Sequence, residues 1–134
     1  MSNSNATIWI HAIWTTRNKQ ALIHSKLKRR LFNFIREYLQ EQGCKVLIVN
    51  GDEYHVQCLF KQNYKRALSE LIGPAKGQSS HYVNYFNLTD SKFSWQVGFN
   101  AFSISEEDLL GLLKKIESNP LYQDNFSKEQ KLAI

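Results

Sequence analysis

The sequence predicts one α+β domain in the split βαββαβ order, with one more helix added at the C-terminal end. Its 134 residues suit a single domain with one real core. An apolar content of 43% and an aromatic content of 13% indicate a folded globule. No apolar run is long enough to cross a bilayer, and the N-terminus lacks a signal-peptide layout, so we expect a cytoplasmic protein.

The first half of the sequence predicts three strands and one helix. Residues 7–14 are rich in β-branched and aromatic types, which favours a strand. A helix follows Ser25, because apolar residues recur at three- and four-residue steps until Gly43 closes the pattern. Strands over residues 44–50 and 54–60 flank an Asn-Gly-Asp turn signal, so we expect an antiparallel hairpin.

The second half predicts a second helical region, a fourth strand and a last helix. The helical pattern begins near Tyr64 and should break at Pro74. Residues 76–80 restart the chain as a loop, and their serines can cap a helix to about residue 86. A strand over residues 99–103 precedes a helix from residue 105, whose Ser-Glu-Glu-Asp start resembles a capping box. The complete order is that of a ferredoxin-like or RRM-like antiparallel sheet, extended by one helix.

The most informative residues for function are His55 and Gln57. Side chains alternate across a strand, so these two should point together to one face of the sheet. Two histidines at this spacing would form a compact metal-binding pair, whereas glutamine is a weaker neutral oxygen ligand. The pattern therefore has two interpretations: a metal site with one ligand exchanged, or an ordinary polar surface on a sheet.

A net charge of +5 favours a polyanionic partner, and the cationic side chains gather in two sets. The sets are Lys26, Lys28, Arg29 and Arg30 at the start of the first helix, and Lys61, Lys65, Arg66 and Lys76 around the predicted 76–80 loop. Either set could be a solvated face or a phosphate-binding patch. Trp95, Phe99 and Phe102 could likewise stack on nucleic-acid bases or belong to the core.

Four segments carry a resemblance to a known family. They are Ile-Trp-Thr-Thr at 13–16, Asp-Glu-Tyr-His-Val-Gln at 52–57, Lys-Gly-Gln-Ser-Ser at 76–80, and Trp-Gln-Val-Gly-Phe at 95–99 leading through Ser-Glu-Glu-Asp at 105–108 to Asn-Pro at 119–120. In this order and spacing the chain resembles the single-strand DNA tyrosine transposases of the HUH type. It is most similar to the group associated with repetitive extragenic palindromes (REP).

This resemblance implies a metal-dependent DNA strand transfer, but not every residue of that chemistry is present. In the family, a His-x-His strand and a polar helix residue hold a divalent metal, and a tyrosine four residues earlier on the helix attacks phosphorus. Carried over to this chain, the metal set would be His55, Gln57 and Asn119, for Mg²⁺ or Mn²⁺. Lys115 stands where the nucleophilic tyrosine belongs. The resemblance thus implies a vestigial site.

Three functions stay open on the sequence alone. The chain could bind single-stranded or hairpin DNA as a catalytically impaired transposase, or serve as a DNA-binding regulator retired from transposition. It could also remain an active strand transferase with altered ligands, for which Tyr82, Tyr85 or Tyr122 would have to replace the missing nucleophile. The same tyrosines could equally be packing or stacking residues. The resemblance also implies a homodimer.

Overall fold

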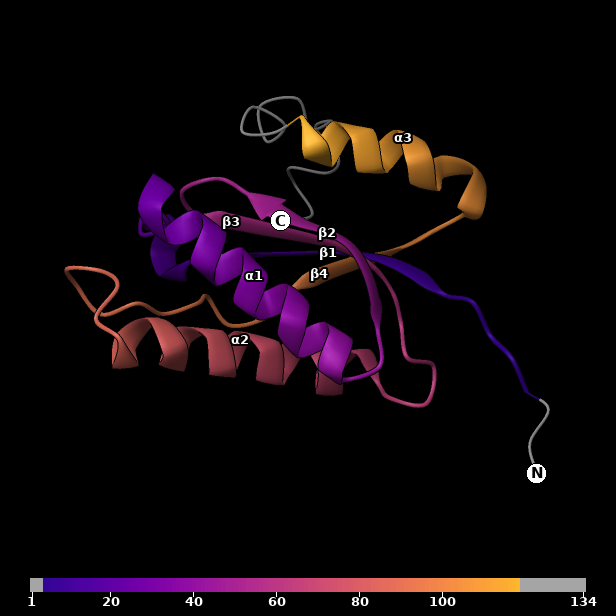
Figure 1. Ribbon diagram of the computed structural model, residues 1–134, viewed down its shortest axis with the longest axis horizontal. Helices are drawn as coiled ribbons and strands as arrows, with labels where there is room; N and C mark the ends of the chain where they lie inside the picture. Colours follow the sequence, from indigo (N-terminus) through magenta and orange to yellow (C-terminus); the bar gives the residue numbers. More distant parts are fainter. Residues whose placement is uncertain (1–3, 119–134) are drawn as a thin grey trace.

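Four strands form one antiparallel sheet in the order β2-β3-β1-β4, and three helices cover its two faces (Figure 1). The computed structural model describes residues 4–118. The elements are β1 (Trp9–Thr15), a short 3-10 turn η1 (Arg17–Lys19), α1 (Ser25–Glu41), β2 (Lys45–Gly51), β3 (His55–Lys61), α2 (Leu68–Tyr85), β4 (Asn100–Ile104) and α3 (Glu106–Glu117). This order confirms the α+β fold class predicted from the sequence.

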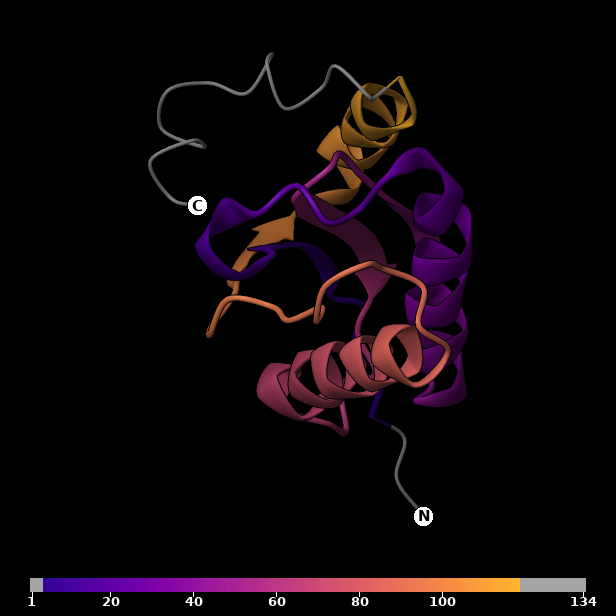
Figure 2. The ribbon, with the colours of Figure 1, turned by 90° about the vertical axis from the view of Figure 1, so that its left-hand side faces the viewer.

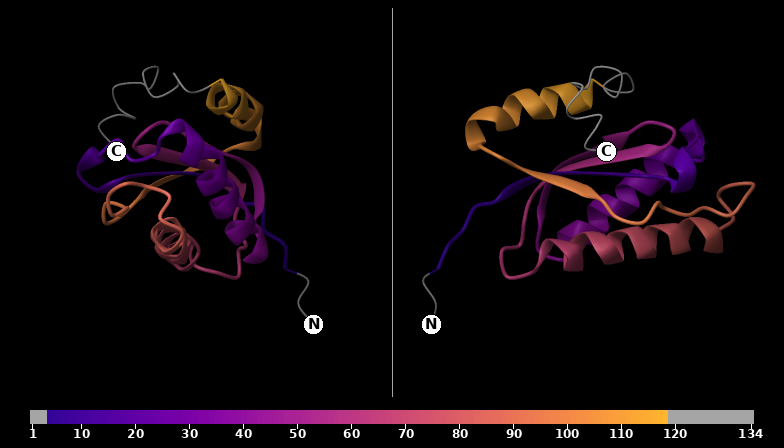
Figure 3. Two further views of the ribbon diagram at one scale, coloured as in Figure 1. Left: turned by 60° about the vertical axis from the view of Figure 1, so that its left-hand side comes forward. Right: turned by 180° about the vertical axis from the view of Figure 1, so that it is seen from behind.

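The sheet separates two hydrophobic cores. Figure 2 shows α1 and α2 on one side of the sheet and α3 on the other, and Figure 3 shows the same layers from two further directions. The larger core lies under α1 and α2, where Ala12, Trp14 and Phe60 meet the buried faces of both helices. The smaller core lies under α3, where Ile13, Leu59 and Ile116 are buried. Successive side chains of β1 and β3 point to opposite faces of the sheet, so the same two strands contribute residues to both cores.

Helix α2 runs without interruption through Pro74, so the predicted break and the predicted loop at residues 76–80 are wrong. A proline disfavours helical geometry in the residue before it partly through that residue's Cβ, and here the preceding residue is Gly73, which has none. Burial of Leu71, Ile72 and Ala75 against the larger core stabilises the helix on either side of the proline. Tertiary packing therefore overrides a local helix-breaking signal.

Two helix starts differ in detail from the sequence prediction. The N-cap of α1 is His24, whose Nδ1 accepts a hydrogen bond from the backbone N–H of Leu27 at 3.2 Å. At the start of α3, the Ser105 hydroxyl lies 3.1 Å from a carboxylate oxygen of Asp108 instead of capping the backbone. The predicted capping box is thus replaced by a contact between side chains.

The turn between β2 and β3 is held tightly to the rest of the fold. The N–H of Asp52 donates to the carbonyl oxygen of His55, and two further backbone bonds join the turn to the segment after β1. Gly51 approaches the other strand so closely that a Cβ at this position would overlap the carbonyl oxygen of His55. Only glycine fits this position without a shift of the backbone.

None of the helices within residues 4–118 is long and apolar enough to span a membrane.

We predict that Gly51→Ala lowers the free energy of unfolding by at least about 1–3 kcal/mol, because the new methyl group must displace backbone. Gly77→Ala is the matched control. Gly77 lies inside α2 with open space around its Cα, so alanine there should stabilise the protein by about 0.5–1 kcal/mol. Urea denaturation of both variants measures the difference. Equal stability of Gly51→Ala and the wild type would show that the turn is not constrained as described.

Candidate functional site

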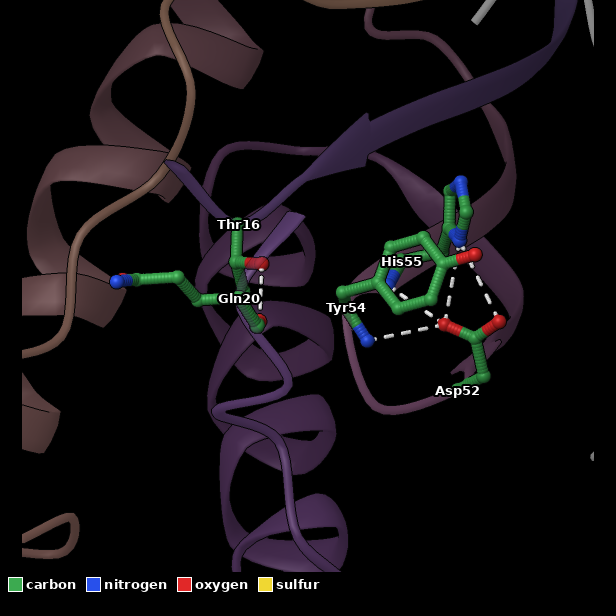
Figure 4. Close-up of polar contacts among 5 residues, drawn as sticks. All are labelled: Thr16, Gln20, Asp52, Tyr54 and His55. Carbon is green, nitrogen blue, oxygen red and sulfur yellow. Dashed lines mark hydrogen bonds and ion pairs between the residues drawn. The ribbon is translucent and has the colours of Figure 1, made fainter. Parts of the chain in front are cut away.

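His55 opens β3, and the preceding turn orients its imidazole. One carboxylate oxygen of Asp52 accepts hydrogen bonds from the backbone N–H groups of Tyr54, at 3.0 Å, and His55, at 2.7 Å. The two carboxylate oxygens lie 3.2 and 3.3 Å from Nδ1 of His55, and the Tyr54 ring lies beside the imidazole (Figure 4). Asp52 therefore holds both the backbone and the ring of His55.

The same contacts determine the charge of Asp52. Burial alone would raise the pKa of this carboxyl, but the hydrogen bond to His55 and the backbone N–H donors outweigh burial and hold the pKa below its ordinary value. The carboxylate is accordingly charged at neutral pH. An anion beside Nδ1 is the arrangement that orients histidine ligands in metal sites.

The segment after β1 reaches the same end of the sheet. The N–H of Thr16 donates to the carbonyl oxygen of Tyr54, and the Thr16 hydroxyl donates to the carbonyl oxygen of Gln20 at 2.5 Å (Figure 4). Thr16 thus links the turn that carries His55 to the chain entering α1.

Gln57 faces the same side of the sheet as His55, as the sequence predicts. Its side chain, however, is hydrogen-bonded to a residue of the neighbouring strand β1. It is fully buried, and its Oε1 lies 2.9 Å from Nε2 of His11 on β1. The Nε2 of Gln57 has no hydrogen-bond partner among the described residues. The spacing that reveals Gln57 in the sequence gives no sign of His11, because the two residues lie on different strands.

His11 is a buried, neutral hydrogen-bond partner. Burial lowers its pKa, and the hydrogen bond with Gln57 offsets this only in part. The neutral ring donates through Nε2–H to Oε1 of Gln57, which occupies one of the two lone pairs of that oxygen. The two strands are therefore joined by a neutral side-chain pair at the centre of the site.

The described residues do not fit a strong divalent-metal site. His55 has a suitably oriented ring, but Gln57 is fully buried and hydrogen-bonded to His11, and amide oxygens are weak ligands. No group of three or more His, Cys, Asp or Glu side chains within residues 4–118 is arranged to hold a metal ion. The third predicted ligand, Asn119, lies outside the described residues.

Lys115 lies on α3, which packs on the face that carries His55 and Gln57. Its side chain lines a cavity of about 450 Å³ together with His11, Phe102 and Asp108. The last turn of α3 is anchored to the sheet by Asn50, whose side-chain amide donates to the carbonyl oxygen of Ile116 at 2.8 Å. The sequence indicated only a turn at Asn50, and its role in placing α3 was missed.

The first basic set lies along the exposed start of α1. Lys26, Arg29 and Arg30 are exposed and Lys28 is half-buried. Arg30 also contacts α2, because its Nε donates to the Tyr82 hydroxyl at 3.2 Å and its guanidinium lies 5.6 Å from the centre of that ring.

The second basic set is divided between two places. Lys61, Lys65 and Arg66 lie at the end of β3 and in the segment before α2, and Arg66 donates to the side chain of Gln42. Lys76 lies within α2, and its ammonium donates to the carbonyl oxygens of Gln96 and Gly98 at 2.6 and 2.5 Å. Burial lowers the pKa of Lys76. This lysine therefore fastens α2 to the segment before β4, and it does not belong to a loop.

The three aromatic residues considered for base stacking lie in different environments. Trp95 is buried in the larger core, where its ring meets Trp14 edge-on and its Nε1 donates to the Ser79 hydroxyl at 3.0 Å. Phe99 packs half-buried against the same core, and Phe102 is exposed beside His11.

Helix α2, which carries Tyr82 and Tyr85, lies on the opposite face of the sheet from α3 (Figure 2), and Tyr82 stacks on Phe34 of α1. Tyr122 lies outside the described residues.

Comparison with known proteins places this geometry in context. A family model described as "Transposase IS200 like" matches residues 4–119. A crystal structure of a candidate transposase from Deinococcus radiodurans R1 superposes with a TM-score of 0.71 at 15% identity, covering 87% of this chain and 94% of that one. The structure of a REP-associated tyrosine transposase bound to a REP hairpin gives 0.65 at 16%, covering 92% and 74%. A search of curated proteins finds no match.

We predict that Asp52→Asn lowers the free energy of unfolding at pH 7 by about 1–3 kcal/mol, because the hydrogen bonds no longer have a charged acceptor. The folded pKa of Asp52 lies below the unfolded value of 3.8. Its stabilising effect is therefore complete above pH 3.8 and disappears as the pH falls through the folded pKa. Denaturation curves of both proteins should converge at low pH. A stability difference that persists unchanged there would exclude Asp52 as its source.

Proposed function

The chain belongs to the IS200-like transposase family, and on this premise we propose that it binds single-stranded or hairpin DNA without cutting it. The observation that carries the proposal is the state of the central pair: the Gln57 oxygen that would face a metal is hydrogen-bonded to His11. The REP-hairpin complex of the structural neighbour supports DNA hairpins as the ligand class to test.

The missing nucleophile supports the same conclusion. Lys115 stands at the position where the family resemblance expects tyrosine, and an ammonium group has no lone pair with which to attack phosphorus. On the surface of α3 it can instead pair with a phosphate group of bound DNA. We propose that the metal set His55, Gln57 and Asn119 is vestigial and binds Mg²⁺ or Mn²⁺ weakly. Such a protein could act as a DNA-binding regulator in the cytoplasm, and we propose that it does so as a homodimer.

One observation favours the alternative of an active strand transferase with altered ligands. Asp52 still orients His55 as the partner of a metal-bound histidine would. This alternative needs a nucleophile, and α2, which carries Tyr82 and Tyr85, lies on the opposite face of the sheet from α3. An assay for a covalent protein–DNA adduct distinguishes the two functions.

We predict that DNA affinity falls steeply with salt, since phosphate contacts release counterions. Replacing Lys28, Arg29 and Arg30 together by Glu should weaken binding to a labelled hairpin and flatten the salt dependence. The logarithmic slope should decrease by roughly 0.7–0.9 for each phosphate that the protein no longer neutralises. Fluorescence anisotropy between about 50 and 200 mM salt measures the slope.

Two further variants make this test specific. Lys26→Glu with Arg29→Glu leaves the contact between Arg30 and Tyr82 intact, so weaker binding by this pair cannot be ascribed to a disturbed helix. Reversal of Lys45, exposed at the start of β2, measures how much one charge reversal outside α1 weakens binding. If all variants bind like the wild type, the start of α1 is only a solvated face.

We predict that the unmodified protein forms no covalent DNA adduct when it is incubated with labelled hairpin DNA and Mn²⁺. Gln57→His together with Lys115→Tyr should restore metal binding and a measurable fraction of cleavage, and either change alone should do less, because ligand and nucleophile serve one step. Denaturing gels detect the adduct.

The matched control is Gln57→His with Lys115→Phe, which restores the ligand and the ring but supplies no hydroxyl. It should bind metal without forming an adduct. An adduct from the unmodified protein that disappears in Tyr122→Phe would refute the proposal and establish an active enzyme with a relocated nucleophile.

A further inference from the structure

An exposed aromatic surface lies at the end of α2, on the face of the sheet opposite the site. Tyr85 is 69% exposed and Phe86 is 54% exposed, and their rings meet edge-on at 4.9 Å. Phe86 also contacts the ring of Tyr82 at 5.3 Å, while Tyr85 contacts His81 at 5.9 Å. These four residues, His81, Tyr82, Tyr85 and Phe86, are here called the α2 aromatic surface.

The start of α1 borders this surface with cations. Tyr82 stacks on Phe34 of α1 at 4.7 Å and receives the hydrogen bond of Arg30, so α1 and the aromatic surface are in direct contact. Lys26 precedes Arg30 by four residues and therefore lies on the same side of the helix, one turn closer to its start. Residues 25–36 contain five cationic side chains and no acidic one.

The geometry of this region is fixed by the fold. Nε2 of His24, at the start of α1, lies 3.1 Å from the carbonyl oxygen of Leu88, just after α2, and this contact holds the two helix ends together. Figure 2 shows the end of α2 and the loop that follows it beside α1, with α3 on the far side of the sheet. Asp90 and Lys92 in that loop balance one another, so the cations of α1 determine the local charge.

We propose that the α2 aromatic surface binds unpaired nucleic-acid bases by stacking, while Lys26, Arg29 and Arg30 hold the adjoining phosphates. The inference rests on the proposed function and specifies which part of the DNA this face recognises. Aromatic rings beside a cationic stripe match a single strand, which offers flat bases and anionic phosphates in alternation. Stacking of this kind tolerates any base, because every base has a π-face. A base-paired stem keeps its bases stacked internally and would contact only the cations.

The charge argues against a protein as the occupant. An interface core is depleted of charged residues, whereas this surface is bordered by the cations at the start of α1. A second copy of this basic chain would also bring the same positive stripe against itself. Single-stranded DNA is complementary to this surface, because its phosphates are negatively charged and its unpaired bases are flat and apolar.

The test compares a single strand with a duplex. Tyr85→Leu combined with Phe86→Leu keeps an apolar surface but removes the rings. We expect binding of an oligothymidylate of about 15 nucleotides to weaken by about tenfold or more, because the stacking of bases on the two rings is lost. Binding of a blunt duplex of about the same length should change by less than about twofold, since its bases are not available to stack. Val97→Ala with Leu110→Ala, which removes exposed apolar side chains elsewhere, should affect neither probe.

Photocrosslinking provides a direct readout. The same oligothymidylate carrying 5-iodouracil should crosslink to the peptide that contains residues 81–86, and Tyr85→Trp with Phe86→Trp should retain both the crosslink and the affinity. Unchanged single-strand binding by the leucine variant would overturn the inference, even if DNA binding itself is confirmed. A wild type that binds neither of these probes nor the labelled hairpin would overturn the proposed function as well. Loss of self-association in sedimentation, with DNA binding unaffected, would also overturn the inference and identify the surface as an interface between copies.

Discussion

The register of β3 determines which side of the sheet His55 and Gln57 face, because a slip by one residue would turn both toward α1 and α2. That register depends on the turn at residues 51–54. Gly51 lies so close to His55 that no side chain fits between them. Asp52 holds the backbone N–H groups of Tyr54 and His55, while the segment after β1 holds the turn from outside. The position of every polar group that β3 presents to α3 follows from this turn.

A hydrogen-bonded pair of neutral side chains, His11 and Gln57, lies at the centre of the site. A histidine at position 57 could serve a metal, but glutamine at 57 and histidine at 11 satisfy each other within the protein. A buried hydrogen bond between neutral groups avoids the desolvation of an ion, although the amide nitrogen of Gln57, with its two N–H donors, has no partner among the described residues. The pair joins β1 to β3 below α3, so its contribution is structural whether or not DNA is bound.

The two faces of the sheet carry different groups. The α3 face holds His55, Gln57 and Lys115, whereas the α1 and α2 face presents the basic start of α1 and the α2 aromatic surface. The proposed stacking surface and the proposed vestigial metal set would then lie on opposite faces of one small domain. A change of residues on the α3 face need not disturb the proposed stacking of bases on the other face.

The sequence by itself determined the order of strands and helices and the shared orientation of His55 and Gln57, because both follow from periodicities of 3.6 and 2 residues. Contacts between distant segments decided the rest. Helix α2 continues through Pro74 because buried side chains on both sides of it outweigh a local break. Lys76 fastens two elements, since two carbonyl oxygens from beyond residue 95 meet its ammonium. His11 reaches Gln57 across 46 residues of sequence. No short-range pattern encodes such pairings, because they exist only after the sheet has brought the strands together.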